Sequence, residues 1–144
     1  MKESVSYTYL LNMMIIFIGI SFCVLLAIFS YSKAFRVNSK IALALEVSEG
    51  YNELSKNEIE SIIKAYGYNE VNGQCKPKNG VEAITGTNGY CLYEIKETVF
   101  AGQPNEAQYI YYGITTYISF DFSVFNSFLK LPVYNTTEKI YVFK

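Results

Sequence analysis

Residues 9–31, YLLNMMIIFIGISFCVLLAIFSY, decide how the rest of the chain is organised. The run carries no charge, and only Asn12, Gly19, Ser21 and Ser30 interrupt its apolar and aromatic side chains. As an α-helix it would measure about 33 Å, enough to cross a hydrocarbon layer of about 30 Å. Because backbone groups in lipid must find partners within their own segment, the run predicts a transmembrane helix.

Two other interpretations of this run were weighed. A cleaved signal peptide has a shorter apolar core, a basic start and a small-x-small cleavage site. Here residues 1–8, MKESVSYT, form a short N-terminal segment in which Glu3 offsets Lys2, and residues 29–31, FSY, do not make such a site. A buried helix of a soluble domain is rarely apolar on every side over this length. We therefore expect the helix to be retained in the membrane.

Composition narrows the functions open to the remaining residues, 32–144, which are enough for one modest domain. The net charge is −1 and no concentrated basic face is present, which argues against a nucleic-acid partner. The chain has no histidine, so the commonest general base and zinc ligand and every histidine-activated nucleophile are absent. We expect no enzymatic activity, no metal, no cofactor and no small-molecule substrate.

The three cysteines fall into two groups. Cys23 lies inside the apolar run, where it serves as a small apolar residue. Cys75 and Cys91 flank a loop rich in glycine, asparagine and lysine, within residues 72–91. Their spacing suits neither a CxxC redox motif nor a structural zinc site. A disulfide between them is the expectation, and it would form in an oxidising compartment.

Two helices are predicted after the membrane run. Phe35, Ile41 and Leu45 recur at near-helical spacing, which predicts an amphipathic continuation over residues 33–48 that ends near Gly50. Its apolar stripe must pack on its own domain or on neighbouring copies. A second helix is predicted over residues 56–66, with Ser55 as the N-cap of a capping box.

The last third of the chain predicts an antiparallel sheet with one face on these helices, and hence an α+β fold. Strands are expected over residues 90–100, 109–125 and 138–143. In the second strand the even-numbered positions are apolar, from Ile110 to Val124. In the first strand Cys91, Tyr93, Ile95 and Val99 share one side, and Leu131-Pro132 predicts a turn before the last strand.

The arrangement of a membrane helix, an amphipathic extension, a helix-packed sheet and a cysteine loop resembles type IV pilin-like proteins. The likeness is closest to the TadE-like minor pilins, or pseudopilins, of tight-adherence pilus systems. Two stretches carry it: the apolar helix running into residues 32–46, SKAFRVNSKIALALE, and residues 112–142, with the turn FLKLPV at 128–133. The resemblance covers about half of the chain and rests on pattern. No Gly or Ala precedes Tyr9, where prepilins are usually cleaved.

This resemblance implies a structural subunit or assembly factor of a pilus or secretion filament that acts by helix packing. Its partners would be the lipid bilayer, other pilin-like subunits and assembly proteins. Glu3 would take the part of the family's acidic residue and neutralise a neighbour's N-terminal amine. Gly19 and Ser21 would permit close helix approach, since small residues let backbones meet. Phe35, Ile41 and Leu45 complete the candidate packing residues.

A second interpretation remains open both for the side of the membrane on which the domain lies and for the function of the protein. Lys33, Arg36 and Lys40 follow the membrane run, and the positive-inside rule would place the following domain in the cytoplasm. The candidate disulfide and the family likeness place it outside, which is our expectation. The alternative function is a single-pass, membrane-tethered binding or sensor module, with the cysteine loop and exposed tyrosines as its contact surface.

Overall fold

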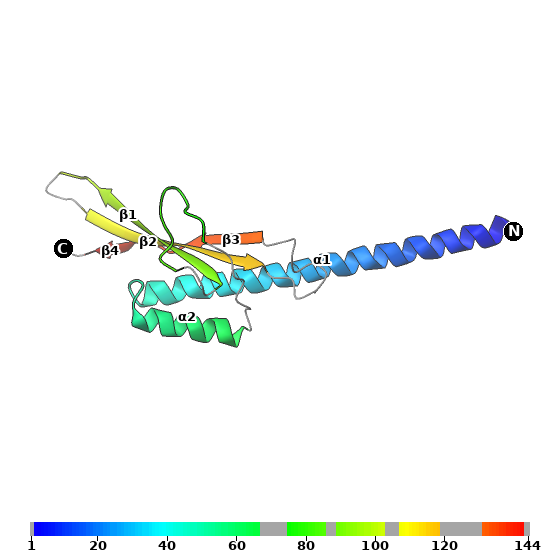
Figure 1. Cartoon of the computed structure of the whole chain (residues 1–144), viewed down its shortest axis with the longest axis horizontal. Coiled ribbons are helices and arrows are strands. Elements are labelled where there is room, and N and C mark those ends of the chain that lie inside the picture. The colour runs from blue at the N-terminus through cyan, green and yellow to red at the C-terminus, as the bar shows by residue number, and fades with distance from the viewer. Residues whose placement is uncertain (1, 67–74, 86–88, 103–106, 119–130, 143–144) are drawn as a thin grey trace.

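The computed structural model of the protein describes residues 2–66, 75–85, 89–102, 107–118 and 131–142. One long helix projects far out of a small domain that contains its C-terminal half, a second helix and an antiparallel sheet (Figure 1). The elements are, in chain order, α1 (Lys2–Val47), α2 (Glu53–Ala65), β1 (Tyr90–Val99), β2 (Ala107–Ile118), β3 (Leu131–Thr136) and β4 (Ile140–Val142). The fold is α+β, as the sequence predicts.

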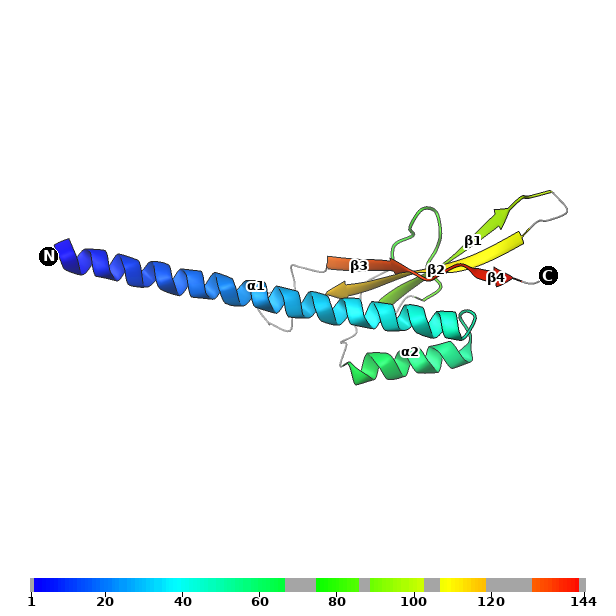
Figure 2. The ribbon, with the colours of Figure 1, turned by 180° about the vertical axis from the view of Figure 1, so that it is seen from behind.

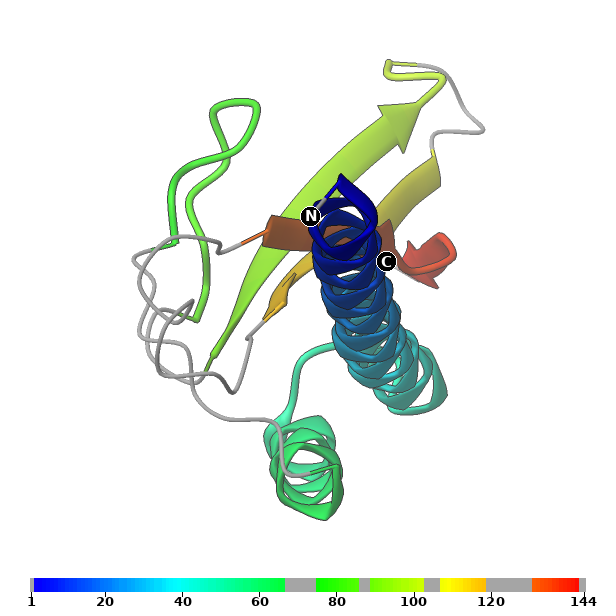
Figure 3. The same ribbon diagram turned by 90° about the vertical axis from the view of Figure 1, so that its right-hand side faces the viewer.

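Helix α1 is unbroken, so the apolar run and the amphipathic segment form a single rod of 46 residues. No proline occurs in it, and Gly19 is its only glycine. Helix α2 lies beside the C-terminal half of α1, and the sheet covers another side of the same half (Figures 1 and 3). The N-terminal half extends beyond every other described element (Figure 2).

The end of α1 differs slightly from the glycine cap that was predicted. Glu49, not Gly50, takes the left-handed conformation, with φ of 52°, and Gly50 follows with φ of 133°. The Gly50 N–H donates to the Leu45 carbonyl at 2.9 Å and the Glu49 N–H to the Glu46 carbonyl at 3.2 Å, which is a Schellman ending. A Cβ at Gly50 would lie 3.0 Å from the Tyr112 hydroxyl, so a glycine suits this position.

Helix α2 begins earlier than predicted, because its N-cap is Asn52 and not Ser55. The Asn52 Oδ1 accepts a hydrogen bond from the Ser55 N–H at 2.9 Å, and the Ser55 Oγ accepts one from the Asn52 N–H at 2.8 Å. Ser55 therefore fills the third helical position of the capping box, which glutamate or glutamine usually takes. Ile59 and Ile63 are buried, and Gly67, near the predicted end, lies outside the described residues.

Strand β2 is the centre of the described sheet. Strand β1 pairs antiparallel with it along one edge. Strands β3 and β4 share the other edge, β3 opposite residues 113–118 and β4 opposite residues 108–110. Between them, the Thr137 N–H donates to the Tyr112 carbonyl and the Thr137 Oγ1 accepts from the Tyr112 N–H, both at 2.9 Å. The Thr137 side chain thus replaces a strand partner where the two edge strands meet.

Two strand predictions need correction. Leu131-Pro132 was predicted to be a turn, but it opens β3, with Pro132 opposite Tyr117. Proline is tolerated there because β3 is an edge strand with one unpaired side. Strand β4 covers Ile140–Val142, so it begins two residues later than the predicted start at 138, and residue 143 lies outside the described residues. Residues 119–125 of the predicted strand 109–125 lie outside the described residues.

The core lies where α1, α2 and the sheet meet. Tyr112 and Ile114 of β2 belong to it, as the even-numbered apolar positions predict. In β1 the core residues are Tyr90 and Leu92, on the side opposite to Cys91 and Tyr93. The first four residues of β1 are all buried. Helices cover one face there and the cysteine loop covers the other, so alternation is lost in this half of the strand.

Candidate functional site

The exposed surface of α1 is the most unusual feature of the molecule. Its most apolar window has no residue buried inside the protein. Phe17 and Phe29, for example, are 73% and 70% exposed. Among the described residues, α1 is the one helix long and apolar enough to cross a membrane, judged by length and composition. Such a surface needs an apolar environment outside the chain, which lipid or other helices can supply.

Of the packing candidates in this half of α1, Gly19 and Ser21 lie on the open surface. A Cβ added at Gly19 would meet no atom within 4 Å. The Ser21 hydroxyl donates to the Phe17 carbonyl at 2.9 Å, so its polar group is satisfied within the helix. Cys23 is a free, exposed cysteine. Glu3 lies in the first turn of α1.

The candidates in the second half of α1 separate into two kinds. Ile41 and Leu45 are fully buried in the core, where they hold α1 to its own domain. Phe35 is 48% exposed and points away from that core. Its ring stacks on Tyr31, with 6.3 Å between centroids. Phe35 therefore lies outside the buried stripe of Val37, Ile41 and Leu45, and its part in packing on neighbouring copies stays a prediction.

One buried polar residue was missed by the sequence reasoning. Asn38 is fully buried, and its Nδ2 donates to the carbonyls of Ile114 and Val133 at 3.3 and 2.9 Å and to the Thr116 Oγ1 at 3.2 Å. The Thr116 hydroxyl in turn donates to the Ala34 carbonyl at 3.2 Å. This network joins α1 to β2 and β3 at the end of the domain nearest the apolar half.

The position of Asn38 carried a readable signal. It precedes Ile41 by three residues and Leu45 by seven, so it falls on the buried stripe. A polar residue on such a stripe needs hydrogen-bond partners across the interface, because an unpaired buried amide is costly. Among the described residues, the Asn38 Oδ1 has no hydrogen-bond partner.

The outward face of α1 within the domain forms a shallow depression of about 620 Å³. Phe35, Arg36, Lys40 and Leu43 contribute to it, so apolar and cationic side chains share its lining. Tyr66 at the end of α2 closes one side of it, and residues 135–136 of β3 close another. This depression belongs to the exposed surface of α1 and adjoins the apolar half.

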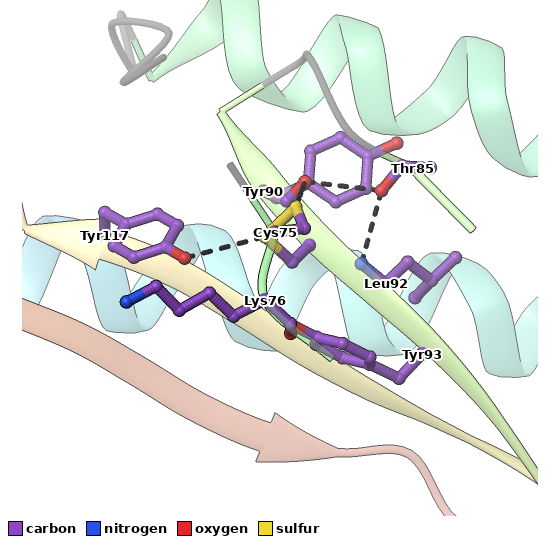
Figure 4. Close-up of a disulfide and its surroundings, with 8 residues drawn as sticks. Cys75, Lys76, Thr85, Tyr90, Leu92, Tyr93 and Tyr117 are labelled. Atoms are coloured by element: carbon purple, nitrogen blue, oxygen red, sulfur yellow. Dashed lines mark hydrogen bonds between the residues drawn. A yellow bond between two sulfur atoms is a disulfide. The ribbon is translucent and has the colours of Figure 1, made fainter. Parts of the chain in front are cut away.

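A second feature is the disulfide between Cys75 and Cys91, which the sequence predicts and the structure contains. It ties the loop to the start of β1, on the face of the sheet that the helices leave open (Figure 4). The Tyr93 hydroxyl donates to the Lys76 carbonyl at 2.7 Å, and the Ile84 N–H donates to the Leu92 carbonyl at 2.8 Å. The loop is thus fixed at several points along β1.

The loop also reaches the opposite edge of the sheet. The Lys78 ammonium lies 3.1 Å from the centre of the Tyr134 ring on β3, a cation–π contact. Burial raises the pKa of the Tyr93 phenol, and the neighbouring Tyr117 and Tyr134 phenols raise it further. On the helix side, burial also raises the pKa of the Tyr90 phenol, with a smaller contribution from Tyr51.

The carboxylates of the sheet make surface ion pairs. Glu94 lies 2.9 Å from the Lys96 ammonium and Glu97 lies 2.6 Å from the Lys139 ammonium. Within the described ranges, no group of three or more cysteine, aspartate or glutamate side chains could hold a metal ion. Among the described residues, the candidate site is therefore the exposed surface of α1.

Comparison of the chain with family models, with curated proteins and with solved structures finds no match in any of the three.

Proposed function

We propose that the protein is a membrane-anchored structural subunit or assembly factor, of the minor-pilin or pseudopilin kind, in a pilus or secretion filament. The observation that carries the proposal is the division of α1 into two halves. One half is apolar and exposed all round. The other half packs on a small domain through Ile41 and Leu45 and is hydrogen-bonded to it through Asn38. Because α1 is one unbroken helix, the position of its apolar half fixes the position of the domain.

Assembly on this proposal is an exchange of surroundings for the apolar half of α1. In the bilayer its side chains contact lipid, and in the filament they would contact the helices of other subunits. Because lipid tails are as apolar as leucine, this exchange depends on close packing and not on the hydrophobic effect. The open surface at Gly19 and the internally bonded Ser21 hydroxyl allow such an approach.

The same proposal places the domain outside the cytoplasm. The disulfide supports this placement, because disulfides persist in oxidising compartments. Its test is labelling of intact cells with a membrane-impermeant thiol reagent, before and after reduction, in a Cys23→Ser background. Labelling of Cys75 and Cys91 only after reduction is expected. Two free thiols that react only after lysis would place the domain in the cytoplasm and overturn the pilin-like assignment.

The helix-packing proposal is tested by photo-crosslinking. A photoreactive residue is placed at Phe17, on the open apolar surface, and at Leu54, at the far end of the domain, as the control. Adducts with apolar helices of other membrane proteins at Phe17, identified by mass spectrometry, are expected in the native cells. If Phe17 gives only lipid adducts in cells that assemble filaments, helix packing is wrong and the membrane-tethered binding module becomes the better assignment.

A further inference from the structure

We propose that the membrane-facing end of the domain binds anionic phospholipid headgroups through Arg36 and Lys40 of α1, assisted by Lys33 and by Lys64 of α2. The inference deepens the proposed function, since it rests on α1 lying in a bilayer. It names the lipid class that the anchor prefers and the residues that select it. It does not depend on which leaflet the domain faces.

The first observation is the placement of charge along α1. Between Tyr31 and Leu45 the helix carries Lys33, Arg36 and Lys40 and no acidic residue. These three positions are spaced i, i+3 and i+7, so they lie on one stripe of the helix. Arg36 and Lys40 are exposed. A cationic stripe therefore begins where the apolar surface ends.

The second observation is distance from the hydrocarbon. If Tyr31 marks the interface, as tyrosine commonly does, Arg36 lies about 7 Å further along the helix axis. The headgroup layer is about 5 to 7 Å thick on each side of a bilayer, so the guanidinium reaches it. Lys40 lies about 13 Å beyond Tyr31, within a Debye length of about 8 to 10 Å from the outer edge of that layer.

The third observation is the opposite charge at the far end of the domain. Helix α2 runs back along α1, so its last turn, which contains Lys64, points in the direction of the apolar half (Figure 1). Its first turn, with Glu53, lies at the far end beside the α1–α2 connection. On α1 Glu46 follows Lys40, and in α2 Glu53, Glu58 and Glu60 all precede Lys64, so the cations lie nearer the apolar half than these carboxylates. The helical layer therefore presents positive charge at the end nearest the apolar half, with Glu60 one turn away from Lys64.

The fourth observation is the shape and lining of the surface. Arg36 and Lys40 share their shallow depression with the apolar Phe35 and Leu43 and with Glu46, whose Oε1 accepts a hydrogen bond from the Glu138 N–H. A phospholipid presents a phosphate beside apolar glycerol and acyl carbons, and this mixed lining matches that chemistry. A soluble phosphate would use the cations alone and leave the apolar part of the lining exposed.

The test uses the full chain reconstituted in phosphatidylcholine bilayers that contain a trace of spin-labelled lipid. Labelled phosphatidylcholine and labelled phosphatidylglycerol are compared by electron paramagnetic resonance, which resolves lipid held at the protein surface. We expect phosphatidylglycerol to be preferred, by up to about fivefold for each cation that contacts a headgroup. The preference should fall as the salt concentration rises.

The decisive variant is Arg36→Gln/Lys40→Gln, which should lower the preference severalfold, to what Lys33 and Lys64 alone supply. Lys56→Gln/Lys139→Gln removes the same charge from other parts of the domain and should leave the preference unchanged. An equal loss in both variants, or a preference that Arg36→Gln/Lys40→Gln leaves undiminished, overturns the inference. So does a preference that inorganic phosphate removes more effectively than chloride at equal ionic strength, because the surface would then recognise a free anion.

The two proposals fail in distinguishable ways. Absence of any held lipid, with either label, would mean that α1 is not in the bilayer, and the membrane anchor itself would be wrong. Held lipid without preference for phosphatidylglycerol would leave the anchor in place and overturn the headgroup site.

Discussion

The Asn38 Nδ2 on α1 donates a hydrogen bond of 2.9 Å to the Val133 carbonyl on β3, across 95 positions of the sequence. The same nitrogen reaches the Ile114 carbonyl on β2 at 3.3 Å. One side chain therefore fixes α1 against two neighbouring strands. Because the apolar half of α1 ends only a few residues before Asn38, these bonds set how the domain sits on its anchor.

Replacement of Asn38 by alanine should lower the free energy of unfolding of the domain by about 1 to 3 kcal/mol, because buried carbonyls of Ile114 and Val133 lose their donor. The measurement is denaturant unfolding of the full chain in detergent micelles, followed by tyrosine fluorescence. Ser39→Ala, one residue along on the half-exposed side of α1, is the control and should change stability by less than about 0.5 kcal/mol. Equal effects of the two changes would mean that the hydrogen bonds contribute nothing.

Leu45 and Leu43 offer a matched pair on the same helix. Leu45 is fully buried and Leu43 is 50% exposed. Leu45→Ala should destabilise the domain by about 2 to 5 kcal/mol, since it leaves a cavity in the core. Leu43→Ala should leave unfolding nearly unchanged. A similar loss of stability in both variants, measured by thermal unfolding, would contradict the assignment of the buried face of α1.

Most of the α-helical part follows from the sequence. The apolar run at 9–31 and the spacing of Ile41 and Leu45 predict a helix that ends at residue 48, one residue beyond the observed end of α1 at Val47. Phe35 does not join the buried stripe, because helical spacing alone does not say which of two apolar faces packs on the domain. Its stacking on Tyr31 could not be foreseen without knowing where the sheet lies.

The sheet was harder to predict where both faces of a strand are buried. Alternation identified the core side of β2, including Tyr112 and Ile114, because one face of that strand packs on the helices. In β1 the cysteine loop buries the second face too, so alternation does not show which side packs on the helices. Pro132 was interpreted as part of a turn, because its place on an edge strand depends on pairing that only the fold reveals.

Reduction or loss of the disulfide should weaken the domain. The cysteines are separated by 16 positions, and closing a loop of this length is worth about 3 kcal/mol in the chain-entropy model. Cys75→Ser/Cys91→Ser should therefore unfold at lower denaturant concentration by a corresponding amount. Cys23→Ser, in the apolar half of α1, is the control and should leave unfolding of the domain unaltered. No difference between the two variants would show that the loop adds no stability.

Gly113 on β2 is closely covered by Tyr134 of β3. A Cβ added at Gly113 would lie 2.8 Å from the Tyr134 hydroxyl and 3.1 Å from its Cε2. Gly113→Ala should therefore displace the ring and disturb its contact with Lys78, at a cost of about 1 to 3 kcal/mol typical of overpacking. In a double-mutant cycle, Tyr134→Ala should remove most of the penalty of Gly113→Ala. Additive effects would mean that the ring and the glycine do not interact.

Stability should fall at alkaline pH because Tyr90 is buried and burial raises the pKa of its phenol above the ordinary value of 10.0. In the unfolded chain this phenol ionises near pH 10, while in the folded domain it stays neutral at that pH. The folded state then holds one proton more, so its contribution to stability is full below pH 10 and is lost as the pH rises above 10. The slope should approach about 1.4 kcal/mol per pH unit for this residue. Unfolding free energies measured between pH 8 and pH 11 test this, and Tyr90→Phe should flatten the curve above pH 10. An unchanged slope in Tyr90→Phe would assign the alkaline loss to other groups.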